Sequence, residues 1–426
     1  MTHDTLCSLG IAVSWLLSLG AGSALGRACN GDEALCDRPY DQVAHLTTHN
    51  AHSNVEDRFT VPLPNQYFNV TGQLERGVRA MMLDTYLYRG RAYLCHGICG
   101  PWGATKMRNT LREIAAFLGA HPNEVLTIIF ESYLDEERTA QAFSDTGLSD
   151  ELYAHLGGPW PSLGEMIDAG TRIVVFTDDP ATVLPWHHYV WDYAWETPFG
   201  SESIEEFTCA EGRGTPGSEL FILNHYVLGP LGSERSTGLE VNQYALLQAR
   251  MVQCWGDGEH NPGYHIPNFV NVDQHDLGDP LGVIGSLNRS WPDPPLWMTV
   301  SGVVPGEVAE LRVEGAEPGE PVYFAASSTG QGLGGCPPVL QGACSDLLDP
   351  VERLGWATAD PHGVATWTTR VPLGLPPGPV STQAFLPRPG SGTKSVAVES
   401  VVPDSLGRAG ATGGLRPGSE PAPTRP

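Results

Sequence analysis

Short apolar runs rich in β-branched residues recur along the first two thirds of the chain, separated by longer and more polar segments. The runs are 43–48, 78–83, 92–94, 125–130, 173–176, 189–191, 220–223 and 269–272. Between them, 107–118 has the period of an amphipathic helix, with an apolar face made of Leu111, Ile114, Ala115 and Leu118. Alternating strands and helices predict an α/β fold with a parallel sheet. Seven or eight strands over about 250 residues predict a closed TIM-type (β/α)8 barrel.

The pattern changes after Ser290. Alternating segments at 296–300, 309–313, 322–325, 364–368, 382–386 and 395–398 are broken by Pro and Gly turns, and most have no helical pattern between them. This pattern is typical of a small antiparallel β-sandwich. We therefore expect a barrel domain over 27–290 and a sandwich over 291–401. The Gly, Pro, Ala and Arg composition of 402–426 predicts a disordered tail.

The first 26 residues resemble an export signal. Residues 9–25 carry no charge, and the run ends in Ala24, Leu25 and Gly26. No Lys or Arg precedes the run, which leaves a buried N-terminal helix as the alternative, but polar residues follow at once from Arg27. We expect a signal peptide over 1–26 and a secreted or periplasmic protein.

The cysteines fit an exported chain. Of the nine, Cys7 would leave with the leader, and the rest form near neighbours. An even number in an exported protein indicates disulfides. A metal site is the weaker reading, because none of the spacings is a CxxC pair. Proximity suggests the pairs Cys29 with Cys36, Cys95 with Cys99, Cys209 with Cys254, and Cys336 with Cys344.

Composition and charge narrow the partners. The chain has 24 Lys plus Arg against 49 Asp plus Glu, a net charge of −25, which argues against nucleic acid and against a polybasic membrane anchor. Hydrophobic residues make up 41 % and charged residues 17 %, enough for a large folded core. After the leader no apolar stretch is long enough to span a bilayer, so at most peripheral membrane contact is expected. The oligomeric state stays open.

Polar or titratable residues stand just after most of the apolar runs of the first domain. They are His49 and Asn50, Asp84, His96, Glu131, Asp178 and Asp179, Asn224 and His225, and Asp273. In a β/α barrel the carboxyl ends of the strands meet at one mouth, so these side chains are expected to form one site. The alternative is that strand ends are exposed and so often polar, which would account for two or three of them.

Two groups within this set suggest chemistry. His49 and His96 could act as base and acid on a bound phosphodiester, with Asp273 orienting one of them. Alone, either histidine is more often structural. Asn50, Asp84 and Glu131 offer hard oxygen ligands that suit Ca²⁺. The alternative for these three is a polar network that braces the barrel mouth.

The ordered motifs together resemble the X-domain family of phosphatidylinositol-specific phospholipase C. The matching segments are 47–51 (TTHNA), 76–84 (RGVRAMMLD), 94–97 (LCHG), 124–131 and 223–225 (LNH), and the resemblance covers roughly 36–275. It extends to exported plant and bacterial members, which share the segment 36–40 (CDRPY). It implies a phosphodiesterase barrel, a phosphoric diester hydrolase or lyase, with the C-terminal sandwich as an accessory domain.

The resemblance also implies residue roles. The inositol 2-hydroxyl would attack phosphorus and displace diacylglycerol, leaving a cyclic phosphate. His96 would protonate the leaving oxygen, and His49 would be the base or would stabilise the pentacoordinate phosphorus. Asp273 matches the partner of the base. The substrate would be an inositol phospholipid or a related soluble phosphodiester.

The family has metal-free and calcium-dependent branches, and the resemblance favours the second. Metal-free members have Arg where this chain has Asp84 and Asp where it has Asn50, whereas Asn50, Asp84 and Glu131 match calcium ligands. Met82 stands where a fourth ligand is expected, which should weaken Ca²⁺ binding and makes His49 the favoured base.

Three further residues are candidates for substrate binding, each with a structural alternative. Arg79 could contact phosphate or pair with a carboxylate within its strand. Asn224 and His225 could line an inositol pocket or close the barrel. An aromatic cluster that includes Trp191 and Trp195 could stack on a sugar ring, dip into lipid or pack in the core. The competing function is a non-catalytic barrel that binds phosphoinositol or glycan, with the sandwich as an adhesion module.

Overall fold

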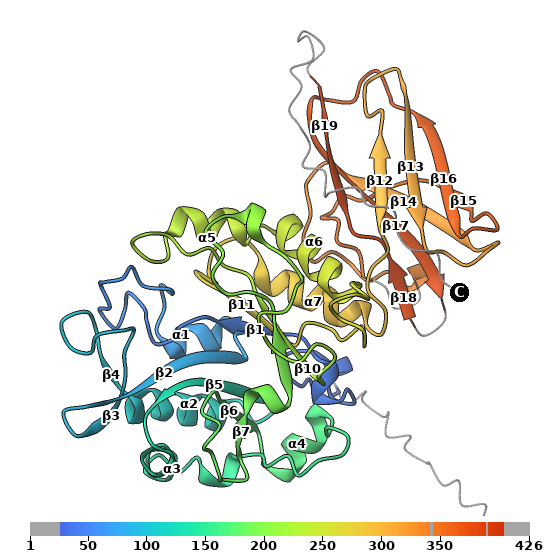
Figure 1. The fold of residues 1–426 in the computed structure, drawn as a ribbon. Coiled ribbons are helices and arrows are strands. Elements are labelled where there is room, and N and C mark those ends of the chain that lie inside the picture. The colour runs from blue at the N-terminus through green and yellow to red at the C-terminus, as the bar shows by residue number, and fades with distance from the viewer. Residues whose placement is uncertain (1–25, 341–343, 389–390, 404–426) are drawn as a thin grey trace, which may run out of the picture.

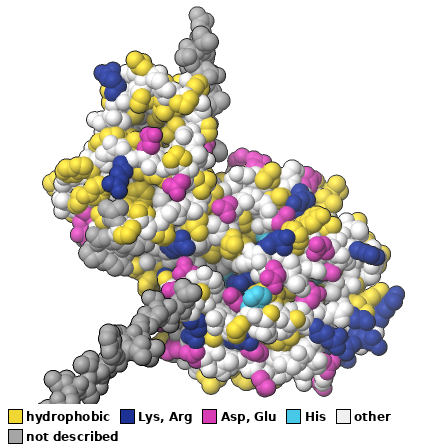
Figure 2. Space-filling view, turned by 180° about the vertical axis from the view of Figure 1, so that it is seen from behind, with side chains coloured by type: hydrophobic (Ala, Val, Ile, Leu, Met, Phe, Trp, Pro, Cys, Tyr) yellow, Lys and Arg dark blue, Asp and Glu magenta, His cyan; other side chains and the backbone are white. Residues whose placement is uncertain are grey.

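The computed structural model describes residues 26–340, 344–388 and 391–403. The expected leader and tail therefore lie outside the described residues, apart from their inner ends. Figure 1 shows an α/β part followed along the chain by a purely β part. Figure 2 shows both parts from behind, with acidic side chains spread over each, as the net charge of −25 leads one to expect.

One sheet with a run of parallel strands forms the α/β part. Along the sheet the parallel strands stand in the order β7 (His187–Tyr189), β6 (Ile173–Thr177), β5 (Leu126–Tyr133), β2 (Ala80–Tyr88), β1 (His45–Thr48), β11 (Phe269–Val272), β10 (Leu220–Asn224) and β8 (Ala194–Glu196). This confirms the mixed α/β fold. A closed barrel is not confirmed, because β7 and β8 at the two ends of the run are not paired with each other among the described residues.

Three short strands depart from the parallel run. β3 (Arg91–Leu94) pairs antiparallel with β2, β4 (Thr105–Lys106) pairs antiparallel with β3, and β9 (Arg213–Gly214) pairs antiparallel with β8. The prediction that 92–94 is a parallel barrel strand was therefore wrong. It is the return arm of a hairpin, since only two residues separate it from β2. Strand β8 lies beyond the expected run at 189–191, of which only Tyr189 is in a strand.

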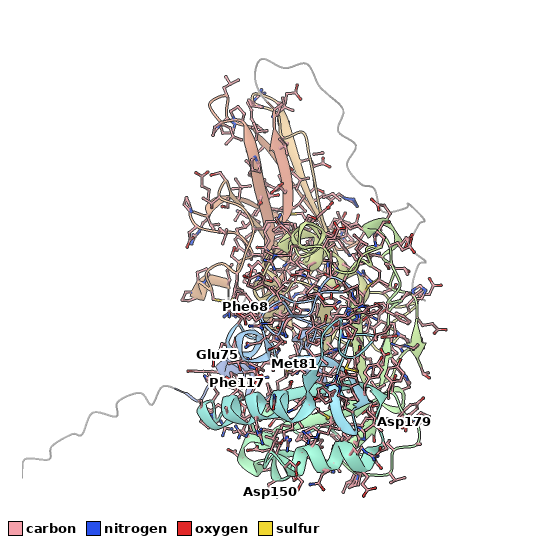
Figure 3. The ribbon with its side chains drawn as sticks, turned by 90° about the vertical axis from the view of Figure 1, so that its left-hand side faces the viewer. Phe68, Glu75, Met81, Phe117, Asp150 and Asp179 are labelled. Atoms are coloured by element: carbon pink, nitrogen blue, oxygen red, sulfur yellow. A yellow bond between two sulfur atoms is a disulfide. The ribbon has the colours of Figure 1, made fainter. Side chains whose placement is uncertain are left out.

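Helices pack against this sheet. They are α1 (Val70–Glu75), α2 (Met107–Ala120), α3 (Glu136–Ser144), α4 (Leu163–Ala169), α5 (Arg235–Val241), α6 (Tyr244–Trp255) and α7 (Pro280–Ser290). The amphipathic pattern at 107–118 is confirmed by α2, which buries Leu111, Ile114 and Leu118. Phe117 of α2 and Met81 of β2 belong to the same buried cluster (Figure 3).

Two antiparallel sheets form the β part. One contains β12 (Met298–Ser301), β13 (Val308–Glu314) and β16 (Val364–Arg370), and the other contains β15 (Glu352–Thr358), β14 (Pro321–Ser327), β17 (Gly378–Arg388), β18 (Ser391–Lys394) and β19 (Val398–Val402). Leu311 of the first sheet and Phe324 of the second are buried in one shared cluster. This arrangement agrees with the expected small antiparallel sandwich.

A buried ion pair lies where the two parts meet. Lys394 Nζ at the end of β18 lies 2.7 Å from Asp346 Oδ1, and both side chains are at most 1 % exposed. The hydroxyls of Tyr244 on α6 and Ser286 on α7 donate to the same carboxylate oxygen at 2.8 and 2.6 Å. In Figure 1, α6 and α7 lie on the side of the α/β part that faces the β part. Polar groups of both parts therefore share one anion.

The four expected disulfide pairs are confirmed: Cys29–Cys36, Cys95–Cys99, Cys209–Cys254 and Cys336–Cys344. Such bonds persist in oxidising compartments. Within the described part of the chain, no helix is both long and apolar enough to cross a bilayer.

Candidate functional site

His49 follows β1 and is paired with an acid from the adjacent strand. Its Nδ1 lies 3.0 Å from Asp273 Oδ1, just beyond the end of β11. The same oxygen accepts a hydrogen bond from Asn65 Nδ2 at 2.9 Å. Because a carboxylate only accepts, the proton of a neutral His49 sits on Nδ1 and Nε2 keeps its lone pair. Asp273 is 5 % exposed, which keeps this pair largely shielded from water.

The turn after β1 aims the next residue, Asn50, back over the sheet. Asn50 has a φ of 44°, a left-handed conformation that Asn tolerates better than most residues. Its neighbour Ala51 donates a backbone hydrogen bond to Met82 O at 2.9 Å. Gln66 Nε2 donates to the carbonyls of His49 and Val272, each at 3.0 Å. These bonds tie the turn to β2 and β11, so the positions of His49 and Asn50 are fixed by the sheet.

The Asn50 amide contacts both imidazoles. One end of it lies 3.2 Å from His49 Nε2 and 3.4 Å from His96 Nε2. When the amide nitrogen points away from the imidazoles, it donates to Asp84 Oδ1 at 2.9 Å, and the amide oxygen then lies 3.2 Å from His49 Nε2. In the reverse orientation the nitrogen faces the two imidazoles and the amide oxygen faces the Asp84 carboxylate. One short side chain thus joins both histidines and the first acid.

His96 reaches this point from the segment that follows β3. Its Nδ1 lies 3.3 Å from the Ser53 hydroxyl. Burial and the nearby His49 lower the pKa of His96 to about 4, although Asp273 and Glu131 act in the opposite direction. His96 is therefore neutral at pH 7 in the unliganded protein.

Three carboxylates stand side by side on neighbouring strands. Asp84 of β2 and Glu131 of β5 are register partners, and Asp178 follows β6. Burial raises the pKa of Asp84 well above its usual range, and Glu131 and Asp178 raise it further. His52 Nε2 lies 3.9 Å from Asp84 Oδ2, and the Tyr133 hydroxyl donates to Glu131. The three carboxylates therefore repel one another, which disfavours the charged form of Asp84.

A cavity of about 300 Å³ opens onto these groups. Its lining includes five of the residues expected from the sequence: His49, Asn50, Asp84, Glu131 and Asn224. Tyr226 also lines it, with its ring stacked on His49 at a centroid distance of 4.0 Å. His96 joins the site through Asn50, and Asp273 joins it through His49. Seven of the nine expected side chains are thus brought together.

Arg79 and His225 lie outside this group of side chains. Arg79 Nε donates to Glu124 at 2.6 Å, and its guanidinium lies 5.0 Å from the ring of Phe117. In Figure 3, Phe117 lies on the opposite side of the α/β part from Asp179, which directly follows the cavity residue Asp178. The structure thus matches the alternative for Arg79, a pair with a carboxylate. It places Arg79 outside the site, because Arg79 precedes β2, whereas the site residues lie further along their strands or just after them.

His225 is fully buried behind the cavity wall. Its Nε2 lies 2.9 Å from Val241 O, and its ring lies 5.0 Å from that of Phe207. Its neighbours Asn224 and Tyr226 face the cavity. Alternate residues of an extended chain point to opposite faces, so His225 faces the other way. The expectation that it lines the pocket was wrong for this reason.

Sequence reasoning missed several cavity residues: Asp178 as a named site residue, and Glu196, Phe199, Arg213 and Tyr226 altogether. Asp178 carried the signal of a polar residue after an apolar run. Glu196 ends β8, a three-residue strand too short to stand out. The two tryptophans of the expected aromatic cluster have different environments. Trp191 lines the cavity, whereas Trp195 is buried and stacked on Phe221.

The oxygen atoms that line the cavity are hard ligands of the kind that suits Ca²⁺. Asn50, Asp84 and Glu131 all line the cavity, and the Asn50 orientation that sets its oxygen against Asp84 is favourable with a cation between them. Met82 lines the same cavity, and its soft sulfur lies 3.0 Å from Asn271 Nδ2. In the described ranges, no group of three or more His, Cys, Asp or Glu side chains is arranged to hold a metal ion. A ligand set here thus depends on the Asn50 amide.

The structure is thus an α/β protein whose run of parallel strands brings two imidazoles and several carboxylates to one site. The family model described as PI-PLC X 1 matches residues 35–288. The chain therefore belongs to the PI-PLC X domain family, as its motifs indicated.

Individual relatives are more distant. The chain is 28 % identical over 292 residues to a PI-PLC X domain-containing protein of Arabidopsis thaliana, covering 62 % of this chain and 65 % of that one. It is 27 % identical over 283 residues to an uncharacterized secreted protein of Arthroderma benhamiae, covering 61 % and 62 %. The chain thus spans less than two thirds of the length of either relative.

A solved phosphatidylinositol-specific phospholipase C of S. aureus matches with a TM-score of 0.42 at 12 % identity, covering 59 % of this chain and 94 % of that one.

Proposed function

We propose that the chain is a phosphoric diester hydrolase or lyase that cleaves an inositol phospholipid or a related soluble phosphodiester by histidine acid–base catalysis. The observation that carries the proposal is that the single Asn50 amide lies within 3.4 Å of Nε2 of both His49 and His96. Two imidazole nitrogens so close to one point can serve a single phosphorus atom.

His49 would be the base. Its Nδ1–H donates a hydrogen bond to Asp273. Its Nε2 can therefore accept the proton of the inositol 2-hydroxyl of the substrate. The resulting oxygen forms a bond to phosphorus, and the bond from phosphorus to the alcohol oxygen breaks. The product is a cyclic phosphate, which water can open to a phosphomonoester.

His96 would be the acid and give a proton to the departing alcohol. It must first acquire that proton, since its pKa is lowered to about 4 in the free protein. A bound phosphodiester carries a negative charge, which favours the imidazolium and raises this pKa. Substrate binding would thus prepare the acid.

We propose that Asn50, Asp84 and Glu131 hold Ca²⁺. The mutual repulsion of the neighbouring carboxylates and the raised pKa of Asp84 support this ligand set. When bound, the ion would offset the charge on the phosphate oxygens. The thioether of Met82 offers no hard oxygen ligand, so binding would be weak.

A second candidate is a protein that binds a phosphoinositol or glycan without turnover. Met82 in the cavity and the neutral state of His96 favour it.

We also propose that the protein is exported. Its four disulfides support this proposal, as does its similarity to a fungal protein that is described as secreted.

Turnover of phosphatidylinositol vesicles and of soluble glycerophosphoinositol, each with Ca²⁺ and with EDTA, tests the proposal. We expect cleavage with Ca²⁺ and a loss of rate in EDTA, with Asp84→Asn imitating EDTA. Binding without cleavage of either diester would favour the second candidate. Equal rates in Ca²⁺ and in EDTA would show that turnover does not need the cation.

A further inference from the structure

Arg213 is carried to the cavity by β9, a two-residue strand that returns along β8 after the connection 197–212. β9 pairs antiparallel with β8, and Arg213 stands directly opposite Glu196. The next residue, Gly214, has a φ of 81°, and a Cβ there would lie 2.3 Å from Ala194 O. The close approach of the two strands thus requires glycine, and it sets Arg213 against the cavity lining.

The guanidinium of Arg213 is held on three sides. Its Nε donates to Glu196 Oε1, and the rings of Trp191 and Phe199 lie 4.7 and 4.6 Å from its carbon. Glu196 is fixed in turn, because its other oxygen accepts a hydrogen bond from Asn224 Nδ2 at 3.0 Å. Aromatic faces and a carboxylate in this arrangement orient a planar cation.

The two terminal nitrogens of Arg213 stay available. Neither of them donates to any of the residues that the structure describes, and the side chain is 45 % exposed whereas that of Glu196 is 2 % exposed. Nη1 and Nη2 carry four of the five guanidinium N–H groups. β9 therefore presents an oriented, unsatisfied donor pair at the cavity.

The charge of the lining limits what these donors can bind. Arg213 is the one Lys or Arg side chain among the lining residues, which include four carboxylates: Asp84, Glu131, Asp178 and Glu196. Glu196 already balances the guanidinium. A second phosphate on the ligand would meet net negative charge here, whereas neutral hydroxyl oxygens would not.

We infer that Arg213 is a specificity-determining residue whose terminal nitrogens donate hydrogen bonds to hydroxyl oxygens of an uncharged polyol head group in the cavity of His49 and Asn50. This inference rests on the proposed function, because it takes the head group to belong to the phosphodiester. Trp191 and Phe199 position the guanidinium, and Glu196 fixes its plane.

Steady-state kinetics on phosphatidylinositol with Arg213→Met and Arg213→Lys test the inference. Arg312→Met is the matched control, an arginine 38 % exposed that is paired with Glu314 in the β part. Because Arg213 is a charged donor, its loss in Arg213→Met should raise KM about 10- to 100-fold. The kcat value should change little, because the head group is held alike in the ground state and the transition state. Arg213→Lys should fold and recover only part of the affinity, since it lacks the planar fork.

Binding of myo-inositol 1-phosphate, followed by NMR titration, gives a readout that needs no turnover. Weaker binding by Arg213→Met with unchanged binding by Arg312→Met would support the inference even if the protein cleaves nothing, so that only the proposed function fails. Turnover by the wild type with KM values equal in Arg213→Met and Arg312→Met would overturn the inference and leave the function standing. Preference for a head group with additional ring phosphates would also overturn it, as would no binding by the wild type.

Discussion

His49 Nδ1 lies 3.0 Å from Asp273 Oδ1, so the imidazole of His49 is held with its Nε2 lone pair toward Asn50 and the cavity. In the proposed mechanism this relationship makes His49 the base and leaves the role of acid to His96. The two roles are separable by experiment, because a base acts on the nucleophile and an acid acts on the leaving group.

Leaving groups distinguish the two histidines. On phosphatidylinositol we expect His96→Ala to lose about 10²- to 10⁴-fold in kcat, the usual contribution of a general acid. On a nitrophenyl ester of inositol phosphate the loss should be far smaller, because nitrophenolate departs without a proton. His49→Ala should lose activity on both substrates, and the exposed His362→Gln on neither. Equal losses for His96→Ala on the two substrates would show that His96 is not the acid.

Asp273→Asn should lower kcat through His49. The amide no longer fixes the Nδ1 proton, so a fraction of His49 takes the tautomer whose Nε2 is protonated and cannot act as a base. The loss in kcat should not exceed the roughly 10²- to 10⁴-fold that a general base contributes. The ¹⁵N shifts of the His49 ring should report the mixed tautomers. Unchanged shifts and an unchanged kcat would remove Asp273 from the mechanism.

The ion pair between the two parts should make a large contribution to stability. Lys394→Met leaves the buried Asp346 carboxylate without its cation, which should cost about 3–5 kcal/mol in the free energy of unfolding. Lys394→Met combined with Asp346→Asn should recover much of this loss, because no charge then stays buried. Denaturant unfolding measures both, with Arg312→Met as a surface control. A Lys394→Met variant as stable as the wild type would contradict the described junction.

Acid should destabilise the fold through its buried histidines. Burial lowers the pKa values of His45 and His225 to about 3, and those of His188 and His275 to about 4. The unfolded chain takes up these protons near pH 6.5, whereas the folded chain does not. The contribution of these neutral histidines to the free energy of unfolding is therefore complete above about pH 6.5. It is lost as the pH falls toward 4, at up to about 1.4 kcal/mol per pH unit for each histidine.

His225→Gln isolates one of these contributions. Its amide nitrogen can replace Nε2 as the donor to Val241 O, and it does not titrate. The unfolding free energy of His225→Gln should therefore fall less steeply than that of the wild type between pH 6.5 and 4, while the exposed His362→Gln runs parallel to the wild type. Parallel curves for His225→Gln would show that His225 is not held neutral.

Most of the α/β part was predictable, because its buried strands are continuous apolar runs and α2 repeats its apolar face every three to four residues. The missed elements lack such a pattern. β8 has three residues, and β15 leaves every residue at least partly exposed, so no apolar alternation marks it. β3 was taken for a parallel strand, because a run of four residues does not reveal the direction of its partner.

The site was predictable where a residue follows an apolar run, and not elsewhere. His49, Asn50, Asp84, Glu131 and Asn224 obey that rule and meet at one cavity. His225 fails it by strand alternation, and Arg79 fails it because it precedes its strand. Arg213 had no signal at all, since its place depends on an antiparallel pairing with Glu196, seventeen residues earlier in the chain. Pairing between short strands is a tertiary property that local sequence does not encode.

Phosphorus NMR of the wild-type protein with phosphatidylinositol tests the central claim most directly, namely that His49 and His96 act on one phosphorus atom. We predict that in Ca²⁺ the diester resonance is replaced by that of a five-membered cyclic phosphate, and that neither His49→Ala nor His96→Ala produces this resonance at a comparable rate. A diester signal that the wild type leaves unchanged, with or without Ca²⁺, would contradict the account.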